Sequence, residues 1–353
     1  MAQKPPKRPN PPRSPQSNDG ERTPKPYALV PFPNREPSLK HPAGHDKYKP
    51  KHWHGVLSLK LTVQTSVHVS TGIVATGTDI GNNKIPLVKT MATVGNKLLI
   101  PGSSLKGVVR SIYEAITNST LAVVSPKYKR KVPKERQPCS KQEKLCPASR
   151  VFGALNWQGL VEFSDAVLQD EKPTLGFMPP LYSPSPDQYK GYYQNQNKNG
   201  LAIGRKFYYN FNRSIDAGSL KQGVPVQQAG NQFVFRTKVY FKNLTEAELG
   251  TLFISLGKDS QYPFVLKVGG GKPIGKGTTF LEITALERAE NPRDRYLKYE
   301  DEPSLLTGND LDKFIEQKTK VVRQGNLVEL PQLKQLAEIL QWPTQNEPPE
   351  GSY

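Results

Sequence analysis

Apolar side chains recur at every second position in two long stretches of the chain, and this alternation constrains the fold more than any other feature. The first stretch carries Leu57, Leu59, Leu61, Val63, Val67 and Val69. The second carries Phe233, Phe235, Thr237, Val239 and Phe241. A period of two predicts a β-strand with one buried face in each stretch.

A helix is predicted after each of these strands. The first follows a short apolar run at 97–100, and its apolar positions are Leu105, Val108, Val109, Ile112 and Ile116. The second opens with a capping box formed by Thr245 and Glu248. Residues 159–165 and 279–286 supply two further strands. The order strand–helix–strand–strand–helix–strand predicts an α+β protein with a ferredoxin-like, RRM-like palm.

The palm is expected to span residues 53–286, with two long insertions at 121–148 and 171–231. Thirteen of the first fifty residues are proline, so residues 1–52 are expected to form a disordered, proline-rich, basic arm. Residues 287–353 are expected to form a C-terminal helical extension. Its clearest apolar stripe consists of Leu333, Leu336, Ala337 and Leu340.

The charge of the chain is strongly positive, with 49 Lys and Arg against 31 Asp and Glu and a formal net charge of +18. Residues 1–50 contribute +6, residues 121–148 another +6 and residues 287–353 contribute −4. The palm is therefore basic in its own right, which predicts a polyanionic partner and favours nucleic acid. A basic surface that serves only solubility is the alternative.

Neither a membrane nor a secretory pathway is indicated. No apolar run is long enough for a transmembrane helix, and the N-terminus lacks the apolar segment of a secretory signal. Cys139 and Cys146 are the only cysteines, so a reducing cytoplasm is expected. These two thiols would supply half of a zinc site, with distant histidines as further ligands, or they are simply free. The candidate histidines are His41, His45, His52 and His54.

The glycine run at 269–277 nearly spells a phosphate-binding P-loop. Gly277 stands where that loop needs Ser or Thr to hold magnesium, and a strand rather than a helix follows, so a nucleotide hydrolase is not favoured. Backbone N–H groups of the run, with Lys272 and Lys276, are instead expected to lie against phosphates. A tight turn that requires positive φ is the alternative.

The segment at 100–110 starts the first helix with two hydroxyl groups, followed by two cations one turn apart. Ser103, Ser104, Lys106 and Arg110 are therefore candidates for an anion site at a helix N-terminus. An ordinary capped helix is the alternative.

Two further groups suggest nucleic-acid chemistry. Asp79 is the only carboxylate between Lys51 and Tyr113. It lies in a Gly/Thr-rich stretch expected to be a loop, where it would hold a divalent metal for phosphodiester cleavage or only form an Asx-turn. The second group is an aromatic cluster that would stack bases or form the core of the insertion. Its members are Arg205, Lys206, Phe207, Tyr208, Tyr209, Phe211 and Arg213.

Five motifs in this order resemble the CRISPR-associated RAMP superfamily. They are Ile100-Pro-Gly-Ser-Ser-Leu-Lys-Gly107, Cys146-Pro-Ala-Ser-Arg-Val-Phe-Gly153, Glu162-Phe-Ser-Asp165, Asn243-Leu-Thr-Glu246 and the Gly269–Gly277 run. The chain is most similar to backbone subunits of type III effector complexes. The stretch Gly204-Arg-Lys-Phe-Tyr208 inside a long insertion favours the III-D branch.

The resemblance implies a palm that holds a guide RNA (crRNA) by its phosphates and ribose and exposes a complementary target RNA. The RNA-binding residues it implies are His68, Ser103, Ser104, Lys106, Arg110, Arg150, Arg205, Lys206, Gly270, Gly271, Lys272, Gly275 and Lys276. Asp79 matches the loop in which catalytic subunits carry a target-cleaving aspartate, which implies Mg²⁺ or Mn²⁺ and attack by the 2′-OH, so that RNA but not DNA is cut.

The implied partners are the other RAMP subunits and the large signalling subunit of a cytoplasmic antiviral defence complex. Two alternatives remain at this point. One is a non-catalytic scaffold subunit of the same complex, and the other is a free-standing guide-processing endoribonuclease.

Overall fold

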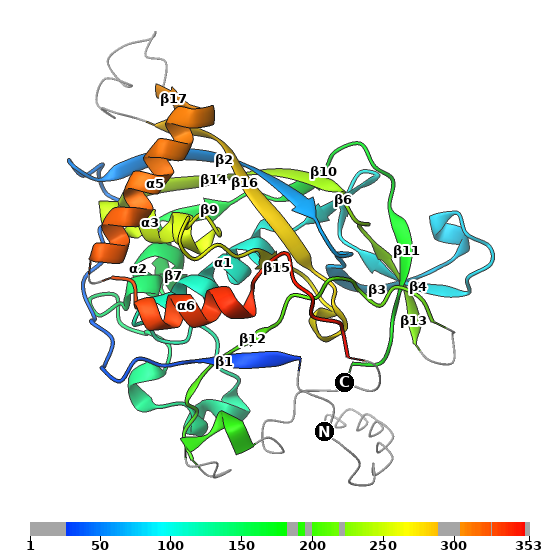
Figure 1. Ribbon diagram of the computed structural model, residues 1–353, viewed down its shortest axis with the longest axis horizontal. Helices are drawn as coiled ribbons and strands as arrows, with labels where there is room; N and C mark the ends of the chain where they lie inside the picture. Colours follow the sequence, from blue (N-terminus) through cyan, green and yellow to red (C-terminus); the bar gives the residue numbers. More distant parts are fainter. Residues whose placement is uncertain are drawn as a thin grey trace, which may run out of the picture.

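The centre of the protein is an antiparallel sheet whose middle strand is β2 (Trp53–Val63) (Figure 1). This strand pairs with β14 (Val234–Leu244) along one edge and with β16 (Thr278–Arg288) along the other. β9 (Val161–Phe163) and β10 (Ala166–Leu168) pair with the far edge of β14. The fourth, first, third and second strands of the palm therefore lie side by side, which confirms the ferredoxin-like fold. The computed structural model describes residues 26–181, 190–194, 200–218, 223–288, 304–325 and 327–349.

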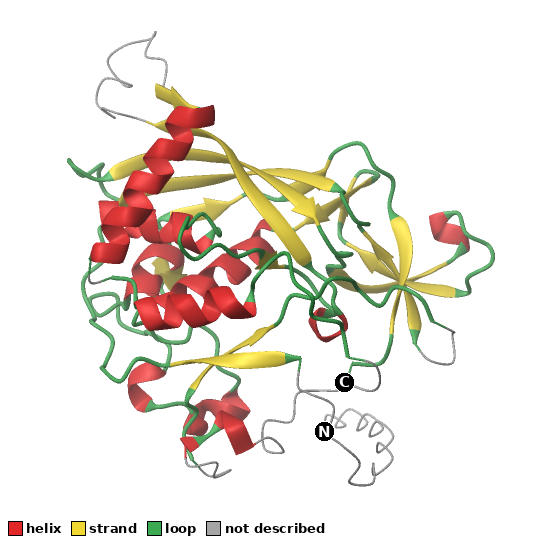
Figure 2. Ribbon diagram, viewed as in Figure 1, coloured by secondary structure: helices red, strands yellow, loops and turns green. Residues whose placement is uncertain are grey.

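Alternation places the apolar side chains of the central strands on one face. Leu57, Leu59 and Leu61 of β2 are at most 2% exposed, and the helices α1 (Gly102–Ile116) and α3 (Glu246–Ser255) pack against this face (Figure 2). Burial of this much apolar surface is the main force that holds sheet and helices together.

The two palm helices begin in different ways. α3 opens with the predicted capping box, in which the side chains of Thr245 and Glu248 each bond the other's backbone N–H. α1 begins after Pro101, and the Gly102 N–H donates to Asp165 Oδ1 at 2.7 Å. A carboxylate that is distant in sequence therefore caps α1.

A second sheet projects from the palm and combines the stretch after β2 with the long insertion. Its order is β11 (Thr174–Met178), β13 (Val224–Gln228), β4 (Leu87–Met91) and β3 (Ser70–Thr76). The Gly/Thr-rich stretch expected to be a loop is thus a strand followed by a short 3-10 turn at Thr78–Ile80. The smaller elements are β5 (Thr93–Val94), β6 (Lys97–Ile100), α2 (Pro147–Phe152), β7 (Gly153–Ala154), β8 (Trp157–Gln158) and β15 (Leu266–Lys267).

The N-terminal segment corrects the expectation of a disordered arm over its second half. Residues 1–25 lie outside the described residues, but β1 (Tyr27–Pro31) pairs antiparallel with β12 (Gly204–Tyr208) of the insertion. Val30 is 1% exposed within the main core. Proline limits such a strand to short length, yet a distant partner strand satisfies its backbone, and this pairing overrides the local composition.

The C-terminal helices complete the core. β17 (Ser304–Leu306) extends the palm sheet beside β16, α5 (Gly308–Gln324) packs on α3, and α6 (Leu330–Ile339) packs on α1 and β1. Within the part of the chain that the structure describes, no helix has the length and apolar character needed to cross a membrane.

Replacement of Val30 by alanine tests whether β1 belongs to the folded core. The Val30→Ala change should lower the free energy of unfolding by about 2 kcal/mol, because two buried methyl groups are lost and a cavity remains. Urea titration measures this change. The control is Val123→Ala, whose side chain is 90% exposed and which should change stability by less than about 0.5 kcal/mol. Equal stability of the two variants would contradict the placement of β1.

Candidate functional site

A basic groove of about 510 Å³ lies where α1, β12 and the glycine run meet. The α1 residues that line it are spaced as one helix face, at positions 104, 107, 108, 111 and 112. The full lining consists of Val69, Ser70, Ser104, Gly107, Val108, Ser111, Ile112, Arg205, Lys206, Phe207, Tyr208, Lys267, Gly269, Gly270, Lys272 and Leu340. The structure thus brings together Ser104, Arg205, Lys206, Gly270 and Lys272 of the predicted set.

The groove is lined by cations without acids. Arg205, Lys206, Lys267 and Lys272 are its charged residues, and none of the described residues that line it is acidic. Arg205 pairs with Glu114 of α1, just outside the lining. The remaining three positive charges have no carboxylate partner among the described residues. Such a surface attracts a polyanion.

Lys206 is held among aromatic rings. Its amine donates to the Tyr208 hydroxyl at 2.9 Å and lies 4.7 Å and 4.5 Å from the ring centroids of Tyr27 and Tyr208. Tyr192 stacks on Tyr27 with 5.8 Å between the ring centroids. The predicted aromatic cluster therefore gains Tyr27 from the N-terminal strand and Tyr192 from the insertion.

Lys267 is a groove residue that the sequence reasoning missed. The residue is 4% exposed, and its amine has no hydrogen-bond partner among the described residues. Burial, and then the charge of Lys272, lower the pKa of Lys267 well below the usual lysine range. Burial, and then the charge of Lys206, lower the pKa of Lys272. A lysine within the apolar run Phe264–Val268 was the available signal.

The glycine run forms a turn that only glycine accommodates easily. Gly269, Gly271, Gly275 and Gly277 have φ of +81°, +69°, +87° and +98°, so the turn explains all of its glycines except Gly270. A Cβ on Gly275 would lie 2.1 Å from the Arg213 carbonyl oxygen. The N–H groups of Gly269, Gly271 and Lys272 donate to no acceptor among the described residues.

Lys276 is a structural residue, which corrects the expectation that it contacts phosphate. Its side chain is fully buried, and its amine donates to Ser66 Oγ at 2.9 Å, Gln228 Oε1 at 2.7 Å and the Asp216 carboxylate. Burial lowers the pKa of Lys276, and Asp216 opposes that shift. These bonds tie the glycine run to the end of β2 and to the insertion.

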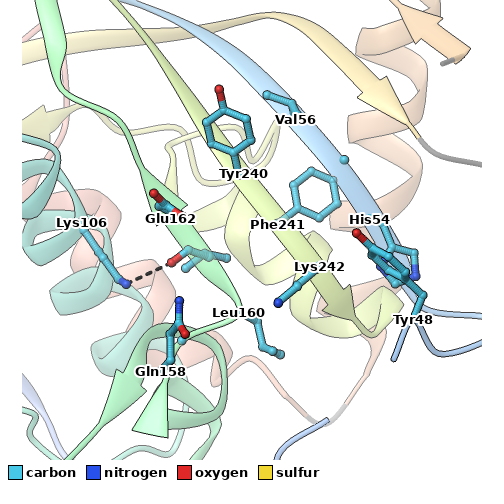
Figure 3. A pocket seen from close by; sticks show the side chains of 13 residues that line it. Tyr48, His54, Val56, Lys106, Gln158, Leu160, Glu162, Tyr240, Phe241 and Lys242 are labelled. Atoms are coloured by element: carbon cyan, nitrogen blue, oxygen red, sulfur yellow. Dashed lines mark hydrogen bonds between the residues drawn. The ribbon is translucent and has the colours of Figure 1, made fainter. Parts of the chain in front are cut away.

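The α1 cations lie away from the groove. Lys106 donates to the Val161 carbonyl at 3.0 Å and lines a separate cavity of about 570 Å³, where Glu162, Tyr240 and Lys242 also lie (Figure 3). Burial and then Arg110 lower the pKa of Lys106, and Glu162 raises it. Ser103 is exposed and absent from the groove lining.

The other predicted contacts serve the interior. Arg110 pairs with Glu114 at 2.8 Å, and Arg150 lies 3.7 Å from Glu248. His68 is 2% exposed, and its Nδ1 lies 2.7 Å from the Gln227 carbonyl oxygen. Burial lowers the pKa of His68, and its own carbonyl accepts from the Gly270 N–H at 2.9 Å. Arg110, Arg150 and His68, which were predicted as RNA contacts, thus bond to protein groups in the structure.

Asp79 lies far from this arrangement in the 3-10 turn between β3 and β4, at the right edge of Figure 2. It is exposed, and its Oδ2 accepts from the Thr76 N–H at 3.0 Å. Hydrogen bonds from the Thr76 hydroxyl and N–H lower the pKa of Asp79. Local turn bonding thus accounts for one carboxylate oxygen, and Oδ1 has no partner among the described residues. A divalent cation here would need RNA phosphates as further ligands.

The two cysteines lie together at the start of α2. The Cys146 sulfur accepts from Thr120 Oγ1 at 3.2 Å, and the Cys146 N–H donates to Cys139 Sγ at 3.4 Å. The neighbouring Cys146 sulfur and then burial raise the pKa of Cys139. The described residues contain no group of three or more His, Cys, Asp or Glu that could hold a metal, so zinc remains a sequence-based prediction only.

Comparison with known families identifies the fold. The sequence model of the RAMP superfamily matches residues 60–280, which is more than half of the chain. The chain belongs to the RAMP superfamily. The match spans the palm of this RAMP protein, from β2 to the start of β16, and includes the groove-lining parts of α1, β12 and the glycine run.

Two other comparisons accompany this assignment. Comparison with curated proteins returns no match. Among solved structures, this RAMP protein is similar to the cryo-EM structure of the type III-B Cmr-beta bound to cognate target RNA, with 17% sequence identity and a TM-score of 0.35. The match covers 67% of this chain and 61% of that chain.

Replacement of Lys276 by methionine tests the structural role of its amine. The change should lower the free energy of unfolding by about 2 to 3 kcal/mol, because the buried Ser66 and Gln228 lose a donor. The Asp216 side chain is 37% exposed, so water compensates part of its loss. Chemical denaturation measures the effect against Lys320→Met, a change on the exposed face of α5. A fully stable Lys276→Met protein would assign the residue to the surface instead.

Proposed function

We propose that this RAMP protein is a guide-RNA-binding backbone subunit of a type III CRISPR ribonucleoprotein. The groove holds the sugar-phosphate backbone of the guide, and bases face outward toward a complementary target RNA. The observation that carries the proposal is a groove in the palm of a RAMP superfamily member. Its described lining has three cations without a carboxylate partner and no acidic residue, and some of its backbone N–H groups have no acceptor among the described residues. The sequence resemblance to type III subunits supports the same assignment.

The groove supports backbone recognition more than base readout. Phosphate contacts come from amines, guanidinium groups and backbone N–H groups, and they carry no sequence information. The groove supplies all three kinds of donor. A guide-binding subunit must accept many guide sequences, so sequence-independent contact is what the role requires.

Aromatic rings beside the groove fit single-stranded RNA. Tyr208 lines the groove, and Tyr27 contacts it edge to face with 5.7 Å between ring centroids. Aromatic side chains stack bases without regard to sequence, and cations beside them hold the backbone. The face of Gly107 offers open space where a Cβ would lie, so a ligand can approach α1 closely there.

The salt dependence of RNA binding tests the groove. Lys206→Gln and Lys272→Gln should each weaken binding to all single-stranded RNA sequences alike. Each should also reduce the slope of log affinity against log salt by about 0.7, the contribution of one phosphate contact. Filter binding at several salt concentrations measures the slope, with the exposed Lys320→Gln of α5 as control. Slopes identical to the unmodified protein would remove both lysines from the interface.

Assembly tests the wider role. Purification of the native protein with its partners, followed by sequencing of the retained RNA, should recover guide RNAs together with other RAMP subunits and the large signalling subunit. Recovery of the chain alone, without RNA, would contradict the proposal.

Target cleavage is a separable part of the proposal and depends on Asp79. Asp79→Asn should leave guide binding and assembly intact but abolish any Mg²⁺- or Mn²⁺-dependent cut that this subunit makes in target RNA. Asparagine keeps the size and loses the charge that would hold the ion. Because the pKa of Asp79 is lowered, the unmodified carboxylate is charged at neutral pH.

Fragment ladders of labelled target RNA, compared between assembled complexes, measure this effect. The matched control is Asp312→Asn, an exposed carboxylate on α5 at the opposite end of the molecule (Figure 1). If every fragment survives Asp79→Asn, this subunit is a non-catalytic scaffold.

A further inference from the structure

Lys267 differs from every other buried lysine that the structure describes. Three lysines are buried within this part of the chain, namely Lys267, Lys276 and Lys318. Lys276 donates to three side chains, and Lys318 donates to Glu246 at 2.6 Å. The amine of Lys267 donates to none of the described residues, and it lies over the Phe211 ring, 5.1 Å from the ring centroid.

Burial of an amine without an acceptor is unfavourable, because water is lost and nothing replaces it. The position of Lys267 suggests what the missing acceptor is. The residue lines the groove together with Lys272, at the base of the glycine run. The N–H groups of Gly269, Gly271 and Lys272, just after it in the chain, also lack acceptors among the described residues. The amine of Lys267 and these three N–H groups thus form one short segment of donors that an anion would satisfy.

We propose that Lys267 is a buried anion-binding residue that holds one backbone phosphate of the RNA together with Lys272 and the glycine run. The proposal rests on the proposed function, because it takes the bound polyanion to be RNA. It assigns the most buried phosphate contact to Lys267, a residue that does not contribute to the charge pattern of the protein surface because it is buried. The flexible stem of the lysine lets its amine turn from the Phe211 ring toward the groove.

Binding at this residue is coupled to proton uptake. In the free protein, burial and Lys272 favour the neutral amine. A phosphate beside the amine favours the charged form and raises its pKa. RNA binding therefore takes up a proton at any pH between the two pKa values, and RNA affinity falls as pH rises through that interval.

The charged and titratable groups around Lys267 also affect the pH dependence of RNA binding. Lys272 lies in the glycine run, and Arg205, Lys206 and Tyr208 belong to β12. Glu114 of α1 neutralises Arg205. His68 lies behind the glycine run, and its buried ring faces the Gln227 carbonyl oxygen. Lys272 shares the burial and the repulsion, so it contributes to the pH dependence that remains without Lys267.

The test compares the unmodified protein with Lys267→Met, a side chain of similar length without charge. At neutral pH, Lys267→Met should bind a short single-stranded RNA about tenfold more weakly, the usual effect of one charge-assisted hydrogen bond. Its affinity should also fall less steeply than that of the unmodified protein as the pH rises toward the ordinary pKa of lysine. Lys320→Met on α5 should match the unmodified protein throughout.

A thermal denaturation measurement on the free proteins keeps the result interpretable. Removal of an unpartnered buried amine should leave the denaturation temperature unchanged or raise it. A lower denaturation temperature would show that the amine has a structural partner and would overturn the proposal.

The outcomes separate this proposal from the proposed function. Salt-dependent RNA binding by the unmodified protein, with an unchanged affinity and pH profile for Lys267→Met, would overturn the role of Lys267 and leave the RNA-binding function standing. Failure of the unmodified protein to bind any RNA would overturn the function itself. Weaker and less pH-dependent binding by Lys267→Met alone supports the proposal.

Discussion

The buried amine of Lys276 is the interaction on which the shape of the groove depends. Through Ser66, Asp216 and Gln228 it joins three segments that are far apart in the chain: the end of β2, the long insertion and the turn before β16. The positive-φ glycines around it could not keep one conformation by themselves, because glycine has the freest backbone. The fully bonded amine of Lys276 therefore fixes the conformation of the glycine run. The glycine run then places its N–H groups beside α1 and β12.

Whether a basic residue has an acid beside it separates structural cations from those available to a ligand. Arg110, Arg150, Arg205 and Lys276 were all predicted as RNA contacts, yet each lies near a carboxylate in the structure. Lys206, Lys267 and Lys272 lack one among the described residues. Ion pairs that are partly buried fix geometry more than they add stability. Cations without a carboxylate partner in a groove remain able to attract an anionic ligand. The net charge alone does not make this distinction.

Much of the palm could be predicted from the sequence, because alternation and capping are local signals. β2, β14, α1 and α3 follow directly from them. The pairing of β1 with β12 could not be predicted, since the two strands are separated by more than 170 residues and proline masks the first. The sequence could have predicted that Ser104 and Lys106 point to opposite sides of α1, because side chains two positions apart on a helix differ by roughly 200° in direction. The burial of Lys267 was not, because it depends on Phe211, Lys272 and the insertion together.

The groove combines a buried, unbonded amine with backbone donors that have no acceptor among the described residues. Among the described residues, the N–H groups of Gly269, Gly271 and Lys272 and the amine of Lys267 donate to no acceptor. A buried amine without an acceptor destabilises the free chain, and a sequence selected only for stability would replace it. A phosphate would satisfy the N–H groups and the amine at once. The amine whose burial is unfavourable in the free protein is therefore a group that a bound phosphate would stabilise. This points to the groove as the binding site more specifically than the net charge does.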